Sequence, residues 1–360
     1  IITTPQRDYI QDLDSLTPAW DLLSWEDYYL CFMDNSSVAL VSSSRGCRNS
    51  CAFCSQQKFW QQTYRTRSPE NFIDEIERLR RQFGVNAFFI GDEYPTHDRD
   101  RWEKILDLLI EKNLGVHLLT ETCATDIIRD RDILHKYRTA GIIHMFIGVE
   151  ATNQKTLDTF KKSQTCHECR EAIRLLNEQN IITECSFILG LPEETNESIK
   201  STLELAQYYN PDNPHFLMIS PWPYADIYQE LQPYIEDWDY RNYNLVKPVL
   251  KPINMTREEV FQEVLKCYKT YYRGKLPHWE ALEDEFKKEL LFRGLESIVQ
   301  NSFLRKHMST MGKMPAAVKK LIAKRQATNT QDKKHYHITL KKEGAGNKKN
   351  PLSPLGRGSG

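Results

Sequence analysis

The chain has 360 residues, of which 40% are hydrophobic, and a formal net charge of −1 at pH 7. This length suffices for one large α/β domain and a smaller appendage, and the near-neutral charge argues against a nucleic-acid partner. No apolar run approaches the twenty residues that would span a bilayer. Nine cysteines without a secretory signal fit a reducing compartment, so we expect a cytoplasmic protein.

Residues 1–35 open at Ile1 and contain a partly apolar stretch at 13–23, which predicts a linker from an upstream domain. From residue 36 to residue 225, short β-branched runs alternate with stretches of helical period, the pattern of a parallel sheet with crossover helices. We expect strands at 38–43, 85–91, 116–120, 144–149, 183–189 and 216–220, and helices at 69–83, 99–112, 130–140, 166–178 and 195–208.

Helix-start signals support two of these helices. Ser68 places a capping residue before Pro69, and Asp130 supplies a carboxylate near another start. Six β/α units predict an α/β fold, a partial (β/α)6 barrel of TIM-like type that is open along one side. In such barrels the chemistry lies at the C-terminal ends of the strands.

Three cysteines follow the first expected strand with the spacing Cys-x3-Cys-x2-Cys: Cys47, Cys51 and Cys54. Iron–sulfur clusters are held by cysteine thiolates, usually four, so three leave one iron of a cubane cluster open. A structural zinc site needs four ligands, and this loop has no second Cys-x2-Cys pair. A disulfide is the other alternative, and the odd number of cysteines argues against it. The spacing therefore favours a cluster.

Glycine and acidic residues fall at the ends of three further expected strands. Gly91, Asp92 and Glu93 follow the second strand, Glu150 closes the fourth, and Gly190 follows the fifth. Such elements are individually common in turns. Their order behind the cysteine loop is what favours one site at one edge of the sheet.

The cysteine pattern, with Phe53 before the third cysteine, resembles the cluster loop of the radical S-adenosylmethionine (SAM) superfamily, and the resemblance covers about residues 36–225. It implies a [4Fe-4S] cluster held by Cys47, Cys51 and Cys54, with SAM at the open iron. The cofactor-binding residues that it implies are Phe53, Gly91, Asp92, Glu93, Glu150, Ile188 and Gly190. Asp92 and Glu93 would contact the SAM amine, Glu150 the amine or ribose, and Ile188 the adenine.

By the same resemblance, the protein cleaves SAM reductively to a 5′-deoxyadenosyl radical, which takes a hydrogen from an organic substrate. A low-potential donor such as a ferredoxin or flavodoxin would supply the electron. The cofactor carries the difficult step, and the protein positions it and excludes water.

Residues 13–21 are similar to the connector of cobalamin-dependent radical SAM enzymes. The runs 54–60, 92–95, 220–224 and 243–248 resemble the anaerobic magnesium-protoporphyrin IX monomethyl ester oxidative cyclase family, which closes the fifth ring of chlorophyll precursors. A tetrapyrrole substrate is implied. Alternatives are a cobalamin-dependent C-methyltransferase and a non-catalytic iron–sulfur-binding fragment.

Two departures from this family matter. The chain has no Asp-x-His-x-x-Gly motif, so cobalamin would come from an upstream domain or a partner protein. Cys123 occupies a position where relatives are expected to carry arginine.

After the core, residues 226–325 predict an aromatic-rich and helical region, with helices from Thr256 and over 282–303, and residues 326–360 a polar, disordered tail. The aromatic residues at 222–243 would line a substrate pocket or pack as core. Cys166 and Cys169 would ligate a metal or lie on an ordinary helix face, which we favour. Cys31, Cys185 and Cys267 are expected in the core.

Overall fold

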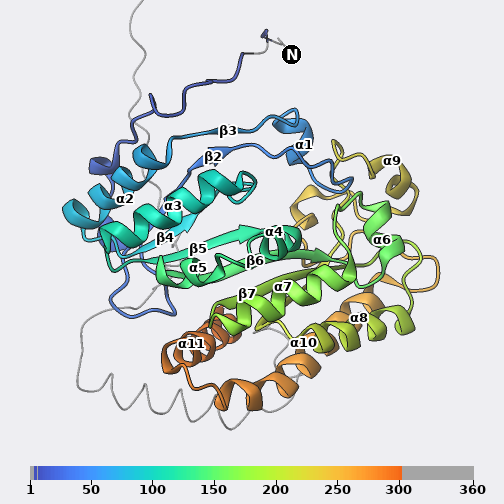
Figure 1. The fold of residues 1–360 in the computed structure, drawn as a ribbon. Helices are drawn as coiled ribbons and strands as arrows, with labels where there is room; N and C mark the ends of the chain where they lie inside the picture. The colour runs from blue at the N-terminus through green and yellow to red at the C-terminus, as the bar shows by residue number, and fades with distance from the viewer. Residues whose placement is uncertain (1–3, 6, 302–360) are drawn as a thin grey trace, which may run out of the picture.

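The computed structural model describes residues 4, 5 and 7–301. Six parallel strands form one curved sheet in the order β1-β4-β5-β6-β7-β8, so each strand lies beside its predecessor (Figure 1). The strands are β1 (Val38–Val41), β4 (Ala87–Ile90), β5 (His117–Thr122), β6 (Ile142–Glu150), β7 (Ile182–Leu189) and β8 (Asn213–Met218). Since β1 and β8 do not pair with each other, the predicted partial barrel is confirmed.

Helices cover the convex face of this sheet. They are α2 (Pro69–Phe83), α3 (Arg99–Lys112), α4 (Ala124–Arg129), α5 (Leu134–Thr139), α6 (Gln154–Thr159), α7 (Cys166–Glu178) and α8 (Asn196–Tyr209). Three of them match the sequence prediction to the residue. Their starts are capped by side chains: Ser68 accepts from the Asn71 amide, Asp98 from Arg101, and Thr165 forms a capping box with Glu168.

The predicted start of the helix at 130–140 is wrong. Asp130 instead ends α4, and the chain turns before α5 begins at Leu134. The Asp130 carboxylate does not cap a helix because it accepts from Arg129 Nε at 2.6 Å and from the Tyr137 hydroxyl at 2.8 Å. Asp130 is therefore a buried acceptor for two side chains and not the cap of a helix.

The last strand also differs from its expected bounds. It begins at Asn213 and includes Pro214, whereas the sequence prediction starts three residues later at Phe216. Proline is tolerated because β8 is an edge strand that pairs only with β7. Among the cysteines, Cys185 and Cys267 are buried as expected, but the prediction for Cys31 is wrong because its side chain is exposed.

The two faces of the sheet differ in their packing. On the convex face Val41, Phe88 and Ile90 are buried in the main core. On the opposite side, called the inner face from here on, Leu40 and Phe89 are paired in register and keep 66% and 39% of their surface exposed. Residues at alternate positions point to opposite faces of a strand, so the inner face is partly open to a ligand.

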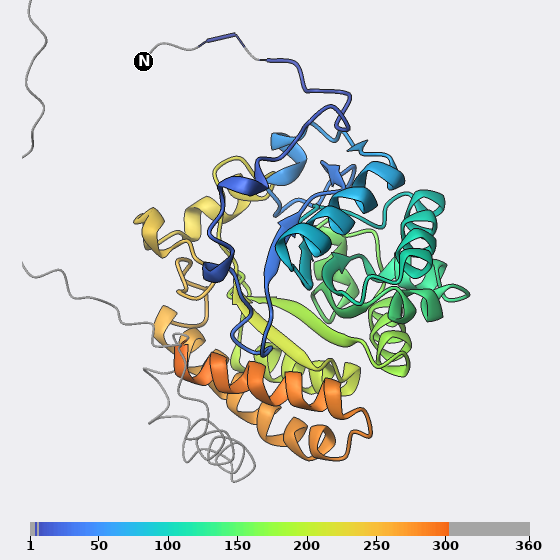
Figure 2. The same cartoon turned by 90° about the vertical axis from the view of Figure 1, so that its left-hand side faces the viewer.

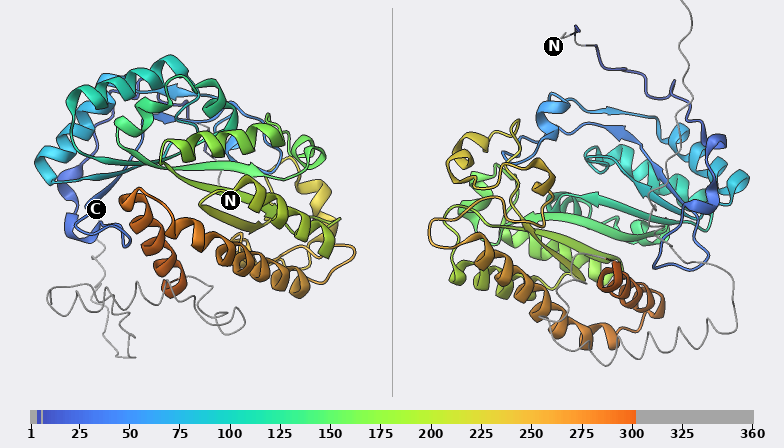
Figure 3. Two further views of the ribbon diagram at one scale, coloured as in Figure 1. Left: turned by 60° about the horizontal axis from the view of Figure 1, so that its bottom comes forward. Right: turned by 180° about the vertical axis from the view of Figure 1, so that it is seen from behind.

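Two small elements flank the cysteine loop: an antiparallel pair, β2 (Ser44–Arg45) and β3 (Arg65–Thr66), and the one-turn helix α1 (Gln56–Phe59). Beyond β8 the chain forms α9 (Tyr228–Leu231), two 3-10 turns (Gln232–Tyr234 and Tyr240–Asn242), α10 (Arg257–Glu280) and α11 (Glu285–Asn301). The expected C-terminal helices are therefore present. α10 packs against α8 and β8, whereas α11 lies across the amino ends of the strands, where Phe286 stacks on His117 of β5 (Figure 2, Figure 3).

The first segment of the chain packs against α2. Its 3-10 turns are Trp20–Leu22 and Trp25–Asp27, and the Trp20 indole donates to Glu75 at 2.8 Å. The tail predicted at 326–360, and the end of the helix predicted at 282–303, lie outside the described residues. Within the described part, none of the helices combines the length and apolarity needed to cross a membrane.

Candidate active site

The cysteine loop begins directly after β1 and is anchored by Asp92, which follows β4. Asp92 is 2% exposed. Its carboxylate accepts from the Ser43 amide at 2.7 Å and from the hydroxyls of Ser42, Ser43 and Ser44 at 3.1, 2.6 and 2.6 Å. Burial raises the pKa of Asp92, and the four donors oppose that shift. The side chain is therefore occupied in holding the loop.

Glu93 braces the other side of the same loop. Its carboxylate accepts from the Gly46 amide at 3.1 Å and from the Trp60 indole at 2.7 Å. Gly46 has φ +97°, and a Cβ there would lie 2.2 Å from the Thr63 carbonyl oxygen. Only glycine fits this turn, which directs the chain toward Cys47.

The three cysteines are free thiols with different exposure: Cys51 is buried, and Cys47 and Cys54 are half-buried. Burial raises the pKa of Cys47 to about 12 and that of Cys51 to about 11. The thiols are thus neutral without metal, and only a strong cation such as iron would hold them as thiolates. Three uncommitted thiols in one braced loop fit a [4Fe-4S] cluster.

Phe53 and Ile188 meet at one apolar cluster although they lie on different elements. Phe53 packs edge-on against Phe160 with ring centroids 5.0 Å apart, and Ile188 of β7 borders the same cluster. Gly190 follows with φ +83°, and its amide donates to Glu194 at 2.8 Å. Ile188, which was predicted for adenine contact, therefore lies in one apolar cluster with Phe53 of the cysteine loop.

Glu150 ends β6 with φ +66° and is 7% exposed. It accepts from Lys162 Nζ at 3.2 Å and from Ser186 Oγ at 2.7 Å. A Cβ on Gly148 would lie 2.3 Å from the Glu150 carboxylate and 2.7 Å from Lys162 Nζ. Glycine at 148 thus makes room for this ion pair. Lys162 was not predicted as a site residue, because it comes from the loop after α6 and no motif marks it.

Glu121 is a second acidic side chain that sequence reasoning missed. It lies on the inner face of β5, where burial and then Glu93 raise its pKa to about 7, while Lys162 opposes the shift. The sequence could have indicated Glu121, because it lies near the C-terminal end of an expected strand and on the alternating positions that face the inside of the barrel.

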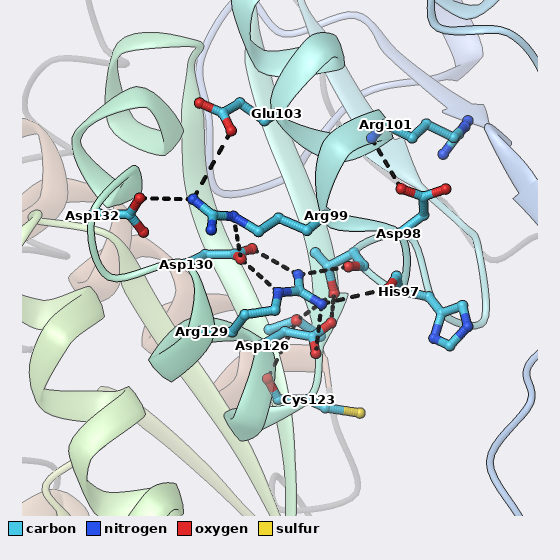
Figure 4. Close-up of polar contacts among 12 residues, drawn as sticks. His97, Asp98, Arg99, Arg101, Glu103, Cys123, Asp126, Arg129, Asp130 and Asp132 are labelled. Carbon is cyan, nitrogen blue, oxygen red and sulfur yellow. Dashed lines mark hydrogen bonds and ion pairs between the residues drawn. The ribbon is translucent and has the colours of Figure 1, made fainter.

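Cys123 begins α4 just beyond β5, and an ion network fixes this turn from outside. Arg129 pairs with Asp126 at 3.2 Å and with Asp130 at 2.6 Å. Figure 4 shows the Cys123 sulfur pointing away from this network, and the Asn49 amide of the cysteine loop lies 3.7 Å from it. Cys123 is therefore turned toward the loop.

The Cys166–Cys169 pair starts α7, as expected, with Cys169 fully buried and Cys166 half-buried. In the portion of the chain that the structure describes, no three or more histidine, cysteine or acidic side chains are grouped to hold a single metal ion.

Four acidic side chains, Asp92, Glu93, Glu121 and Glu150, lie near the cysteine loop, and Lys162 pairs with Glu150. Two arginines, Arg67 and Arg101, bind the carbonyls of Ser42 and Ser43. SAM carries a sulfonium and an ammonium group, for which Glu121 and Glu150 are suitable partners.

The family model for the radical SAM superfamily matches residues 41–206. The anaerobic magnesium-protoporphyrin IX monomethyl ester cyclase of Rubrivivax gelatinosus is 38% identical over 85% of this chain and 55% of its own length. The same-named protein of Cereibacter sphaeroides is 37% identical over 83% of this chain and 49% of its own. The chain thus spans about half the length of the curated relatives it matches.

Among solved structures, the cobalamin-dependent SAM radical enzyme OxsB, determined with aqua-cobalamin and SAM bound, superimposes with a TM-score of 0.56. The match covers 82% of this chain and 50% of that one at 14% identity, which shows a shared fold. Together with the cysteine loop and the six-stranded barrel, these similarities establish that the chain belongs to the radical SAM superfamily, whose members use a [4Fe-4S] cluster and SAM.

Proposed function

We propose that this protein abstracts hydrogen from a magnesium tetrapyrrole and acts in oxidative cyclisation, as the names of its relatives state for those proteins. One observation carries the proposal: a loop with three free cysteines is braced by two carboxylates at the edge of the barrel where Glu121 and Glu150 also lie. The identity to two cyclases favours the cyclase over the C-methyltransferase.

In this proposal Cys47, Cys51 and Cys54 hold the cluster, which when bound and reduced supplies the electron for SAM cleavage. The protein side chains then orient the cofactor. Glu150, with one carboxylate oxygen held by Lys162 and the other by Ser186, contacts the SAM amine or ribose. The backbone after β4, at Gly91 and beyond, contacts the amine, because the Asp92 and Glu93 side chains are taken up by the loop.

Phe53, Ile188 and Gly190 provide the apolar contact for adenine, and the surrounding cluster excludes water from it. A ferredoxin or flavodoxin supplies the electron. Cobalamin, if this protein uses it, binds to a region or protein outside the chain, as the absence of its motif from the sequence implies.

The test is anaerobic reconstitution followed by reduction with dithionite and measurement of 5′-deoxyadenosine, with and without magnesium-protoporphyrin IX monomethyl ester. We compare the parent with the triple variant Cys47→Ala, Cys51→Ala, Cys54→Ala, and with Cys31→Ala as a control at an exposed cysteine. The parent and the control should release 5′-deoxyadenosine, faster with the tetrapyrrole, and the triple variant none.

The organic product separates the alternatives. Loss of hydrogen with ring closure supports the cyclase. A product heavier by one methylene unit shows the C-methyltransferase instead. No 5′-deoxyadenosine from a fully loaded cluster would contradict catalysis and leave an iron–sulfur-binding fragment.

A further inference from the structure

Three polar side chains from neighbouring strands are joined on the inner face of the barrel, outside the cofactor residues. Glu184 of β7 lies between His144 of β6 and His215 of β8. Its two carboxylate oxygens lie 2.7 Å from His144 Nε2 and 2.6 Å from His215 Nε2. Nothing in the cluster or SAM chemistry accounts for this group.

The register places this group next to the SAM end of the barrel. His215 pairs with Ser186 across β7 and β8, so their Cα atoms lie about 5 Å apart and their side chains share a face. The Ser186 hydroxyl donates to Glu150 at 2.7 Å. A ligand that touches His215 therefore lies within one strand of the residues assigned to SAM.

The carboxylate fixes which nitrogen of each ring is free. Each oxygen of the Glu184 carboxylate faces one ring nitrogen, at 2.7 Å for His144 Nε2 and 2.6 Å for His215 Nε2. An ionised carboxylate only accepts hydrogen bonds, so each ring must carry its hydrogen on Nε2. In the neutral ring, Nδ1 then holds the lone pair that binds a metal.

His215 is the better placed of the two rings. Its side chain keeps 30% exposure, against 12% for His144. Within the described chain, His215 Nδ1 has no hydrogen-bond partner, whereas His144 Nδ1 is fully buried and unpaired. Phe146 lies near the His215 ring with centroids 6.5 Å apart. The exposed ligand atom thus stands beside an aromatic side chain.

We propose that the inner face binds a metallotetrapyrrole, with His215 Nδ1 as the axial ligand of its central metal and Glu184 as a positioning residue. The proposal rests on the proposed function and names its substrate site. A metal-binding histidine commonly donates its other ring hydrogen to a carboxylate, which orients the ring and raises its basicity. The exposed Leu40 and Phe89 on the same face supply apolar surface for a planar macrocycle.

The experiment titrates the reconstituted protein with magnesium protoporphyrin IX, zinc protoporphyrin IX and metal-free protoporphyrin IX, and records the Soret absorption band. The variants are His215→Ala, Glu184→Gln and, as a control on the exposed side of α5, His135→Ala. Parent and control should bind both metalloporphyrins with a red-shifted band, and should bind the metal-free ring about tenfold more weakly.

His215→Ala should lose the band shift and the preference for metal, and added imidazole should restore the shift. Glu184→Gln should keep binding but show a smaller shift, since the ring loses its oriented, basic partner. Urea unfolding of both variants, compared with that of the parent, shows whether they are folded.

An unchanged band shift in His215→Ala, or equal affinity of the parent for metal-free and metal-containing rings, would overturn the axial-ligand proposal. The proposed function would survive that result if magnesium-protoporphyrin IX monomethyl ester still accelerates SAM cleavage. If no tetrapyrrole binds and none accelerates SAM cleavage, both proposals fall.

Discussion

At the amino ends of β7 and β8, Asp212 is buried between Lys275 and Lys287, whereas at the carboxyl ends Glu150 pairs with Lys162, which also lies near Glu121. Asp212 lies 2.8 Å from Lys287 and 3.7 Å from Lys275 and also accepts from the Thr183 amide. At this lower end two cations face one acid.

At this lower end, both lysines make further hydrogen bonds. Lys287 also donates to the Ile181 carbonyl at 3.0 Å, and Lys275 to Asn210 Oδ1 at 2.6 Å. Burial lowers the pKa of Lys275 to about 8 even beside Asp212. At the carboxyl ends of the strands, by contrast, the pKa of Glu121 is raised, and the three thiols of the cysteine loop are neutral. The charged groups at the amino ends have their partners within the protein, whereas we propose that those at the carboxyl ends bind a cationic ligand.

The largest loss of stability should come from removing the Asp212 carboxylate at the lower end. Asp212→Ala leaves two buried lysines without their counter-ion, which costs about 3–5 kcal/mol of unfolding free energy. Urea unfolding measures the loss. Adding Lys287→Met to this variant should recover part of it, because one buried charge is removed. Full stability in the single variant would show that the ion group does not hold the end together.

Asp92→Ala should be the next largest change. It removes the acceptor of four hydrogen bonds in the cysteine loop, so we expect a loss of about 3 kcal/mol and a lower iron content after reconstitution. Asp92→Asn, which keeps an acceptor oxygen, should lose less. Iron and sulfide analysis with urea unfolding measures both. Normal iron content in Asp92→Ala would exclude the anchoring role.

Glu121→Gln should alter the pH dependence of stability. Because the folded pKa of about 7 lies above the ordinary glutamate value of 4.5, the folded state retains a proton that the unfolded state has lost in this window. The free energy of unfolding therefore falls as pH rises from about 4.5 to 7, by about 2 kcal/mol after allowance for solvent screening.

The variant should flatten this slope, and Glu197→Gln on the exposed start of α8 should keep it. Urea unfolding of the metal-free protein at several pH values gives the comparison. Equal slopes in the parent and Glu121→Gln would refute the raised pKa.

Gly148→Ala should have the smallest effect. The added methyl group would push Glu150 and Lys162 apart, because both lie under 3 Å from the new atom. We expect SAM to bind about tenfold more weakly, or about 1.4 kcal/mol, and the crowding to lower the free energy of unfolding by about 1 kcal/mol. Calorimetric titration with SAM measures it, and Gly294→Ala, which has open space around it, is the control. Unchanged affinity would remove Glu150 from the SAM site.

The sequence predicts the order of elements well because the decisive signals are local. Ser68 before Pro69, for example, places the start of α2 at the residue where the structure has it. The start of β8 was missed because proline is tolerated only where the strand lies at the edge of the sheet. The break at Asp130 was missed because it depends on the contact of Asp130 with Tyr137.

For the candidate site, the cysteine spacing predicts the cluster loop without the structure. The pairing of Glu150 with Lys162, and the group of His144, Glu184 and His215, could not be predicted. These contacts depend on strand register and on which face each residue occupies, and no local pattern in a single sequence determines the register between three strands.

We propose that the end of the barrel with the three thiols binds SAM at the open iron of a cluster. Electron paramagnetic resonance of the dithionite-reduced, reconstituted protein, before and after addition of SAM, tests this binding. We predict that SAM shifts the g-values of the cluster in the parent, and that Glu150→Gln needs more SAM for the same shift. A fully loaded cluster whose spectrum does not change at saturating SAM would contradict the account.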